Sequence, residues 1–568
     1  MTTPVCCTRE GVVSRIWVHA TCEFFAFTMR FSLSSLMTMY NSLVGSGVDD
    51  SCSEVPKLPV VVVGGGLAGL AASIEASKAG ASVVLMEKAN RIGGNSAKAT
   101  SGINGALTAA QKENEHADTL GSFTKDIIKS GGGRSTPELV DVLVQKSSEA
   151  VEWLETFGLD LSLLSQCGGH EAPRTHRIPP GADGRPVPVG WTTVQKVYKF
   201  VEDHPEQISV MTNSDVQSLM TNEDGHVTGV RYQQGGEGEV MELPAASVVL
   251  TTGGYAYDRS EGSLLSQFAP ERLHLATTSG PQATGDGVRL GQAAGASLVD
   301  MDQVQVHPTS LVNPEDPTNL SKFLAPESMR GSGGILLDAQ GKRFANELTT
   351  RSVLTDAIFK AGTPMPAGKR EDGSDEGIAP TVAYLVLNEE AADAFGTGVL
   401  GFYMSKGLVR RASDAVEASA LMGHTDGGKT LTETLEAYTA TANGEREDDF
   451  GKTVFPAKNF SPKQTLYVSI ITPAIHYTMG GVRIDGEGRA LREVSGDGGA
   501  ASPIPGLFAA GEVTGGVHGA NRLAGNSLLE CVVIGRLAGQ HAGGEAAARS
   551  SEGCGDIDAA AVASESEL

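Results

Sequence analysis

The chain has 568 residues, 40% hydrophobic and 20% charged, as is usual for a soluble globular protein. One core rarely serves more than roughly 250 to 300 residues, so we expect more than one domain. The formal net charge of −24 argues against nucleic acid or an anionic membrane as a partner, because their phosphates would be repelled. The seven cysteines lack CxxC spacing, so no metal site is expected, and no apolar run reaches the roughly 18 residues of a membrane span.

Residues 1–55 differ in composition from the rest of the chain. Arg9 and Arg15 lie in Ser/Thr-rich sequence, as in a targeting segment, whereas Glu10 and Glu23 argue against one. A targeting segment and a disordered start therefore both stay open. A presequence would place the protein in mitochondria or another organelle lumen, and without one we expect the cytoplasm.

The first regular elements form a βαβ unit. Residues 58–63 are a β-branched run, typical of a strand buried on both faces. Residues 67–79 are small and apolar with helical character, and residues 82–86 read as a second buried strand.

Glycines at fixed spacing connect the first strand to this helix. Gly64, Gly66 and Gly69 satisfy GxGxxG: the first permits a tight turn, the second lets the backbone approach a pyrophosphate, and the third lets helix and strand pack. The helix N-terminus stabilises the anion. Glu87, at the end of the second strand, is placed to hold ribose hydroxyls. The pattern predicts a dinucleotide site.

A second glycine-rich loop follows Glu87 and favours FAD over NAD. It contains Gly94, Asn95 and Ser96, and it continues to Ser101 and Gly102. The diphosphate and flavin of FAD need these additional backbone amides, and the small side chains leave room for a flat ring.

Two later strands, residues 247–252 and 506–510, end in glycine as the first does, which indicates one sheet interrupted by insertions. Between them, residues 352–360 and 430–441 are helix-like. We therefore expect an α/β fold, with a Rossmann-like FAD-binding domain split by an inserted α+β capping domain. The expected parts are a targeting or disordered segment (1–55), the FAD-binding domain (56–302 and 476–545), the cap (303–475) and a disordered tail (546–568).

His307, His476 and Arg522 lie in polar or glycine-rich sequence, away from any obvious solvated face. Arginine suits bidentate recognition of carboxylates. If the three residues converge, they form a dicarboxylate clamp; the alternative is three scattered structural roles.

Seven sequence blocks in one order carry a family resemblance. They read GGGLAGLAA, RIGGNSAKATSGING, QVHPT, ESMRGSGGILLD, GKRFANELTTR, HYTMGGV and GEVTGGVHGANRLAGNSLLE. Over residues 58–540 the chain resembles the flavoproteins of the fumarate reductase and succinate dehydrogenase family. It is most similar to the soluble, single-chain fumarate reductases of microbial eukaryotes and to the flavin domains of bacterial flavocytochromes. The resemblance implies an FAD-dependent fumarate reductase that forms succinate.

The resemblance also implies catalytic roles. Arg351 would deliver a proton to the substrate, and Glu327 and Arg330 would relay protons to it. Arginine is an unusual acid, because guanidinium groups hold their protons tightly, so the relay and neighbouring charge must assist. The residues that would hold the two substrate carboxylates are His307, His476, Arg522 and the Gly525 backbone.

The same resemblance implies a set of FAD contacts and two departures from the family pattern. The contacts are Ala68, Glu87, Lys88, Ser96, Gly102, Val216, Asp286, Tyr477, Glu512, Ser527 and Leu528. Pro326 stands where flavocytochromes have threonine, which removes one hydrogen bond expected at a substrate carboxylate. Some relatives attach FAD through a histidine after the second strand, but here the loop reads Asn95-Ser96-Ala97-Lys98, so we expect noncovalent FAD.

No haem or NADH module is evident in the sequence, so we expect electrons from outside, from reduced FMN or FAD or from a separate reductase. Two alternatives stay open. One is a related reductase or oxidase of another unsaturated acid or of L-aspartate, which the clamp residues disfavour. The other is a flavin-binding partner protein without catalysis, against which the intact Arg351 argues.

Overall fold

The computed structural model describes residues 57–182, 187–236, 238–365, 368–369, 375–376, 378–493 and 501–564. The expected targeting or disordered segment, residues 1–55, lies outside the described residues, as do residues 565–568 of the expected tail. Within the described part, no helix combines the length and hydropathy needed to cross a membrane.

A six-stranded sheet forms the centre of the FAD-binding part. The strands, in sheet order, are β23 (Arg489–Arg492), β24 (Ser502–Ala509), β10 (Ser247–Leu250), β1 (Val60–Val63), β2 (Val83–Glu87) and β6 (Ile208–Thr212). All neighbours are parallel except β23 and β24. All four valines of β1 are buried, as the β-branched run predicts. The expectation of one sheet from distant segments is confirmed, since β10 pairs with β1 on one side and β24 on the other.

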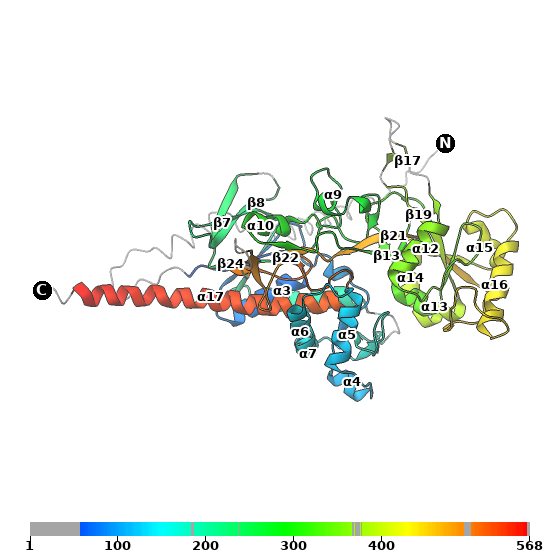
Figure 1. Ribbon diagram of the computed structural model, residues 1–568, viewed down its shortest axis with the longest axis horizontal. Helices are drawn as coiled ribbons and strands as arrows, with labels where there is room; N and C mark the ends of the chain where they lie inside the picture. The colour runs from blue at the N-terminus through cyan, green and yellow to red at the C-terminus, as the bar shows by residue number, and fades with distance from the viewer. Residues whose placement is uncertain are drawn as a thin grey trace, which may run out of the picture. The chain divides into compact units, whose positions relative to one another are not determined.

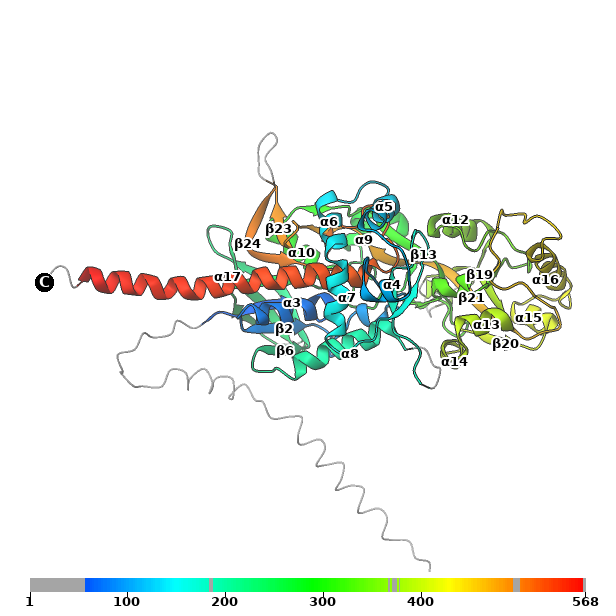
Figure 2. The ribbon, with the colours of Figure 1, turned by 90° about the horizontal axis from the view of Figure 1, so that it is seen from below.

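Two helices, α3 (Leu67–Lys78) and α17 (Asn526–Ser564), run side by side against this sheet (Figures 1 and 2). Glycines of α17 lie at the contact. A Cβ at Gly535, Gly539 or Gly543 would come 2.7, 2.2 or 2.6 Å from a carbonyl oxygen of α3. Only glycine permits helices to approach this closely.

The end of α17 differs from the expected disordered tail. The helix continues through residue 546 to Ser564. The alanine-rich composition that suggests a low-complexity tail also has the strongest intrinsic helix propensity, and here a helix already anchored on α3 extends into it.

The remaining elements of the FAD-binding part surround the sheet. They form two small antiparallel sheets, β3-β5-β4 and β7-β8-β9, and one small mixed sheet, β12-β22-β25. The helices are α4 (Ala109–Glu113), α5 (Leu120–Ser130), α6 (Pro137–Gln145), α7 (Ser147–Glu155), α8 (Val189–Glu202), α9 (Leu264–Phe268) and α10 (Asp286–Ala293). The strands are β3 (Ile103–Asn104), β4 (Leu163–Ser165), β5 (Thr175–Arg177), β7 (Ser214–Thr221), β8 (Val227–Gln234), β9 (Val240–Pro244), β11 (Ala276–Thr277), β12 (Leu298–Val299), β22 (Gly481–Arg483) and β25 (Thr514–Gly515).

The inserted part is built on a second sheet, with the strand path β14-β13-β21-β19-β15. These strands are β14 (Phe323–Leu324), β13 (Val304–Leu311), β21 (Leu466–Thr478), β19 (Thr381–Asn388) and β15 (Ile335–Leu337), and β16 (Thr363–Pro364) and β20 (Arg410–Ala412) pair beside them. The helices are α11 (Glu327–Gly331), α12 (Arg351–Ala361), α13 (Glu389–Phe395), α14 (Thr397–Ser405), α15 (Ala415–Leu421) and α16 (Lys429–Ala442).

The two parts have separate buried clusters, one drawn from residues 60–304 and 475–546 and the other from residues 311–471. This supports the proposed division into an FAD-binding domain and a cap. The strands β13 and β21 pass from one part to the other as an antiparallel pair, so β21 crosses the boundary placed at residue 475. Side chains on this strand pair therefore lie at the junction of the two domains.

Candidate active site

The turn between β1 and α3 is shaped to receive a pyrophosphate. Gly64 has a backbone φ of +111°, a value that residues with a side chain rarely adopt. Gly66 precedes α3, and a Cβ there would meet only Ser96 Oγ, at 3.6 Å, so the helix N-terminus stays open to an anion. Gly69 serves packing instead, because a Cβ there would lie 1.9 Å from the Gly64 carbonyl oxygen.

The carboxylate of Glu87 is held at the end of β2 by two backbone groups. The N–H of Gly65 donates to Oε2 at 2.8 Å, and the N–H of Ala89 donates to Oε1 at 2.8 Å. The next residue, Lys88, forms an ion pair with Asp286 at the start of α10. The end of β2 is thereby tied to a helix that the sequence places far away.

A cavity of about 1210 Å³ runs along this edge of the sheet and on toward the cap. Of the residues expected to contact FAD, only Gly69 does not line it. The lining includes Gly64, Gly66, Ala68, Glu87, Lys88, Gly94, Asn95, Ser96, Ser101, Gly102, Val216, Asp286, Tyr477, Glu512, Ser527 and Leu528. A helix N-terminus, a carboxylate at the strand end and small side chains beyond them fit FAD. Among the described residues, no cluster of three or more His, Cys, Asp or Glu could hold a metal ion.

Glu512 is a partly buried acid in the wall of this cavity. Its Oε1 accepts hydrogen bonds from the Thr478 N–H at 3.0 Å and from the Thr478 hydroxyl at 3.2 Å. Burial outweighs these bonds and raises the pKa of Glu512 to about 7. The carboxyl is therefore able to accept or donate a hydrogen bond to a ligand hydroxyl near neutral pH.

The structure brings His307 of β13, His476 of β21 and Arg522 together at the cap end of the cavity. The centroids of the two imidazole rings are 5.4 Å apart. The guanidinium of Arg522 lies over the ring of Tyr477, 4.6 Å from its centroid. His476, Arg522 and Gly525 line the cavity, whereas His307 is buried beside His476. The antiparallel pairing of β13 with β21 explains how distant histidines meet.

Positive charge dominates the electrostatics of this cluster. Burial, with the charges of Arg351, Arg330 and Arg522, holds the pKa of His307 well below its ordinary value. Burial and the neighbouring His307 and Arg522 likewise lower the pKa of His476. Both imidazoles are therefore neutral at physiological pH and can donate an N–H without adding charge.

Arg351, Glu327 and Arg330 form a connected group on the cap side. Arg351 Nη2 and Nε donate to Glu327 Oε2 at 3.0 and 3.2 Å. Burial would raise the pKa of Glu327, but Arg351 and Arg330 lower it to about 2. Arg330 is buried, and its Nη1 donates to the carbonyl of Glu347 at 2.6 Å. Its Nε and Nη2 have no hydrogen-bond partner within the described part of the chain.

Two polar residues absent from the sequence-based site connect these groups. Gln305 Oε1 accepts from Arg351 Nη1 at 3.4 Å, and its Nε2 donates to the Arg522 carbonyl at 2.9 Å. The Thr278 hydroxyl lies 2.7 Å from Nδ1 of His476. Gln305 stands two residues before His307 in a strand, and this spacing places both side chains on one face. The sequence pattern could therefore have predicted Gln305 as a site residue. Nothing in the sequence around Thr278 marks it.

Two other sequence features have structural explanations. Pro326 immediately precedes α11, which begins at Glu327, and it lines the cavity without offering a hydroxyl. His518, in a glycine-rich setting like the site histidines, instead binds Glu530, with Nε2 at 2.9 Å from Oε2. Tyr477 and Thr514 contact the same carboxylate, so His518 belongs to a buried network beneath the clamp.

Comparison with known proteins agrees with this geometry. Residues 59–528 match the family described as FAD binding domain. The chain is 41% identical to a fumarate reductase of Schizosaccharomyces pombe, covering 85% of this chain and 88% of that protein. The chain belongs to the FAD-binding fumarate reductase and succinate dehydrogenase flavoprotein family.

Other members of the family are similar over most of their length. This flavoprotein is 40% identical to fumarate reductase 1 of Saccharomyces cerevisiae, covering 85% of this chain and 98% of that protein. Its fold is similar to the open conformation of a flavocytochrome c3 fumarate reductase, with a TM-score of 0.69 and 32% identity over 86% of this chain and 78% of that one. The expected α/β fold with a FAD-binding domain and a cap is confirmed.

Proposed function

We propose that this flavoprotein is a fumarate reductase, which adds a hydride to one alkene carbon of fumarate and a proton to the other to give succinate. The observation that carries the proposal is the convergence of Arg351 with His307, His476 and Arg522 at one end of the FAD cavity. The two fungal fumarate reductases at 41% and 40% identity support it.

The cationic end of the site binds the substrate carboxylates. Arg522 offers a guanidinium fixed against the Tyr477 ring, and the neutral His307 and His476 offer N–H donors. Donors aimed at one carboxylate draw electron density from the adjoining double bond, so the far alkene carbon becomes receptive to hydride. Gly525 presents backbone at the same wall of the cavity.

Arg351 supplies the proton. Its guanidinium is oriented by Glu327 and by Gln305, and it belongs to a group in which Glu327 stays ionised. An ionised Glu327 can take up a proton and return it to Arg351 after each turnover, and buried Arg330 favours that anion.

FAD, when reduced, supplies the hydride, and it is held here without a covalent bond. The loop after β2 offers Asn95 and Ser96 to the cavity, where a covalent attachment would need a nucleophilic histidine. The electrons come from an external donor, either reduced FMN or FAD or a separate reductase.

Anaerobic turnover tests this proposal. Purified yellow protein is mixed with reduced FMN or a reduced dye and fumarate, and succinate formation is measured along with donor oxidation. We expect one succinate per two electrons. Other enoates replace fumarate in the same assay, and L-aspartate is tested separately as an electron donor under air without reduced FMN. Turnover confined to one of these substrates would overturn the fumarate assignment.

The mode of flavin attachment has its own measurement. Denaturation in acid should release all of the FAD into the supernatant. Flavin remaining on a peptide after proteolysis would contradict noncovalent binding and leave the proposed reaction untouched.

A further inference from the structure

A short segment between β4 and β5, residues 167–171, reaches two parts of the site at once; we call it the bridging segment. At one end, the N–H of Gly168 donates to Oε1 of Glu327 at 3.2 Å. The other oxygen of that carboxylate accepts from Arg351. Glu327, on the cap, is thus held by an arginine of the cap and by a backbone group of the FAD-binding domain.

At its other end the bridging segment holds the turn that carries the substrate clamp. His170 Nε2 lies 2.9 Å from the carbonyl oxygen of Ala524, between Arg522 and Gly525 in sequence. Asn104 Nδ2 donates to the same oxygen at 2.7 Å. Burial lowers the pKa of His170 to about 4, so at neutral pH it is an uncharged N–H donor. Its contact with the turn therefore does not change with pH in the working range.

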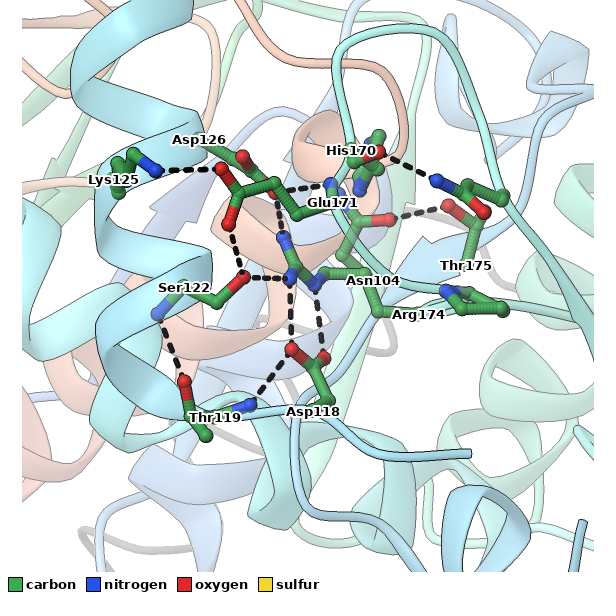
Figure 3. Close-up of polar contacts among 12 residues, drawn as sticks. Asn104, Asp118, Thr119, Ser122, Lys125, Asp126, His170, Glu171, Arg174 and Thr175 are labelled. Atoms are coloured by element: carbon green, nitrogen blue, oxygen red, sulfur yellow. Dashed lines mark hydrogen bonds and ion pairs between the residues drawn. The ribbon is translucent and has the colours of Figure 1, made fainter. Parts of the chain in front are cut away.

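A buried ion cluster fixes the bridging segment in place (Figure 3). The guanidinium of Arg174 lies between Asp118 and Asp126, and all three side chains are buried. Asp126 also accepts from the N–H of Glu171 at 2.8 Å. A buried charge cluster of this kind is costly to break, since removing one partner leaves an unpaired charge. The segment is therefore a rigid support.

We propose that the bridging segment is a positioning element that keeps the proton relay and the substrate clamp in register across the two domains. Gly168 orients Glu327 toward Arg351, and His170 orients the turn of Arg522. The proposal rests on the proposed function. It adds the positioning residues Gly168 and His170, which do not line the cavity and act through Glu327 and Ala524.

The substitution Gly168→Ala tests the first contact with little risk to the fold. Gly168 is exposed and its φ lies outside the left-handed region. A Cβ there would lie 2.3 Å from Glu327 Oε1, and the nearest other atoms belong to the same carboxylate. The substitution therefore displaces Glu327 and little else. Gly121→Ala on α5 is the matched control, because a Cβ there would meet nothing within 4 Å.

We expect Gly168→Ala to lower kcat about 10- to 100-fold, as a misplaced catalytic group does, with the KM for fumarate nearly unchanged. The displaced carboxylate also loses its hydrogen bond from the N–H of residue 168, which raises the pKa of Glu327, so any limb of the kcat profile that reports this group shifts to higher pH. Gly121→Ala should behave as the wild type. An unchanged kcat for Gly168→Ala would overturn the role of Gly168.

The second contact is tested with His170→Leu and His170→Gln. We expect the leucine variant to raise the KM for fumarate about 10-fold while keeping FAD, and the glutamine variant, which keeps a neutral N–H donor, to restore most of that loss. Equal KM values for wild type and His170→Leu would overturn the role of His170.

Hydrogen exchange tests the bridge without turnover. The amide of Gly168 should exchange faster in Glu327→Ala than in the wild type, and equal rates would contradict the bridge. A wild-type protein that does not reduce fumarate would overturn the proposed function alone, because the exchange measurement is independent of it.

Discussion

Arg351 directs two nitrogens, Nε and Nη2, at a single oxygen of Glu327. This leaves Nη1, which contacts Gln305, as the nitrogen on the side of the clamp. In the proposed reaction, this geometry separates the face of the guanidinium that would receive protons from the face that would meet substrate.

Because of this separation, we expect Arg351→Ala to affect turnover and not ligand binding. We expect the variant to keep its yellow colour and its affinity for succinate, and to lose fumarate turnover by about 10²- to 10⁴-fold, the usual contribution of a positioned acid. Steady-state assays and succinate titration of the flavin absorbance measure the two effects. Arg231→Ala, in an exposed ion pair with Glu242, is the control. Unchanged turnover would remove Arg351 as the acid.

Arg522→Ala should act on binding instead. Loss of the guanidinium leaves a substrate carboxylate without its charged partner, at a cost of about 2–5 kcal/mol. We expect both fumarate and succinate to bind at least roughly 30-fold more weakly, as measured by flavin absorbance titration. Equal affinities in wild type and variant would show that the carboxylates bind elsewhere.

Gly69→Ala should destabilise the FAD-binding domain, because its Cβ would lie 1.9 Å from the Gly64 carbonyl oxygen. We expect a loss of about 1–3 kcal/mol in the free energy of unfolding, together with weaker FAD retention. Thermal unfolding with and without added FAD measures both. Gly544→Ala, at an α17 position where a Cβ meets nothing within 4 Å, should be neutral or slightly stabilising.

The raised pKa of Glu512 predicts a pH-dependent stability of the FAD-free protein. The folded protein binds this proton more tightly than the unfolded chain does, since the pKa rises from 4.5 to about 7. The contribution of protonated Glu512 to the free energy of unfolding is thus fully present below pH 4.5 and is lost as the pH rises to about 7. Between these two pH values the wild type should lose on the order of 3 kcal/mol of its free energy of unfolding. The variant Glu512→Gln, which has no carboxyl group at this position, should not show this loss. Parallel pH profiles of unfolding for wild type and variant would contradict the shift.

The dinucleotide half of the site could be predicted from sequence because its signals are local. The strand, GxGxxG turn and helix follow one another, and Glu87 ends the next strand, so chain order alone places them together. The ion pair of Lys88 with Asp286 was expected only as two separate cofactor contacts. Its pairing depends on how α10 packs beside β2, which local sequence does not encode.

The prediction of the substrate-binding half of the site rests on the family resemblance. From the residues alone, a clamp and scattered structural roles both stay open for His307, His476 and Arg522, because the meeting of the two histidines depends on the register of β13 against β21. That register includes a shift between Gln305 and Val306, which no periodicity in the sequence reveals. The contacts of Gly168 and His170 are still harder to predict from the sequence, because they join a loop to partners on two other segments.

The FAD cavity takes its walls from both ends of the described chain, from Gly64 at the first strand to Leu528 at the start of the last helix. During synthesis, the GxGxxG turn emerges long before the residues that face it. The cofactor can therefore be captured only by a nearly finished polypeptide. Loss of the final helix by truncation would yield a flavin-free protein, however intact its opening motif.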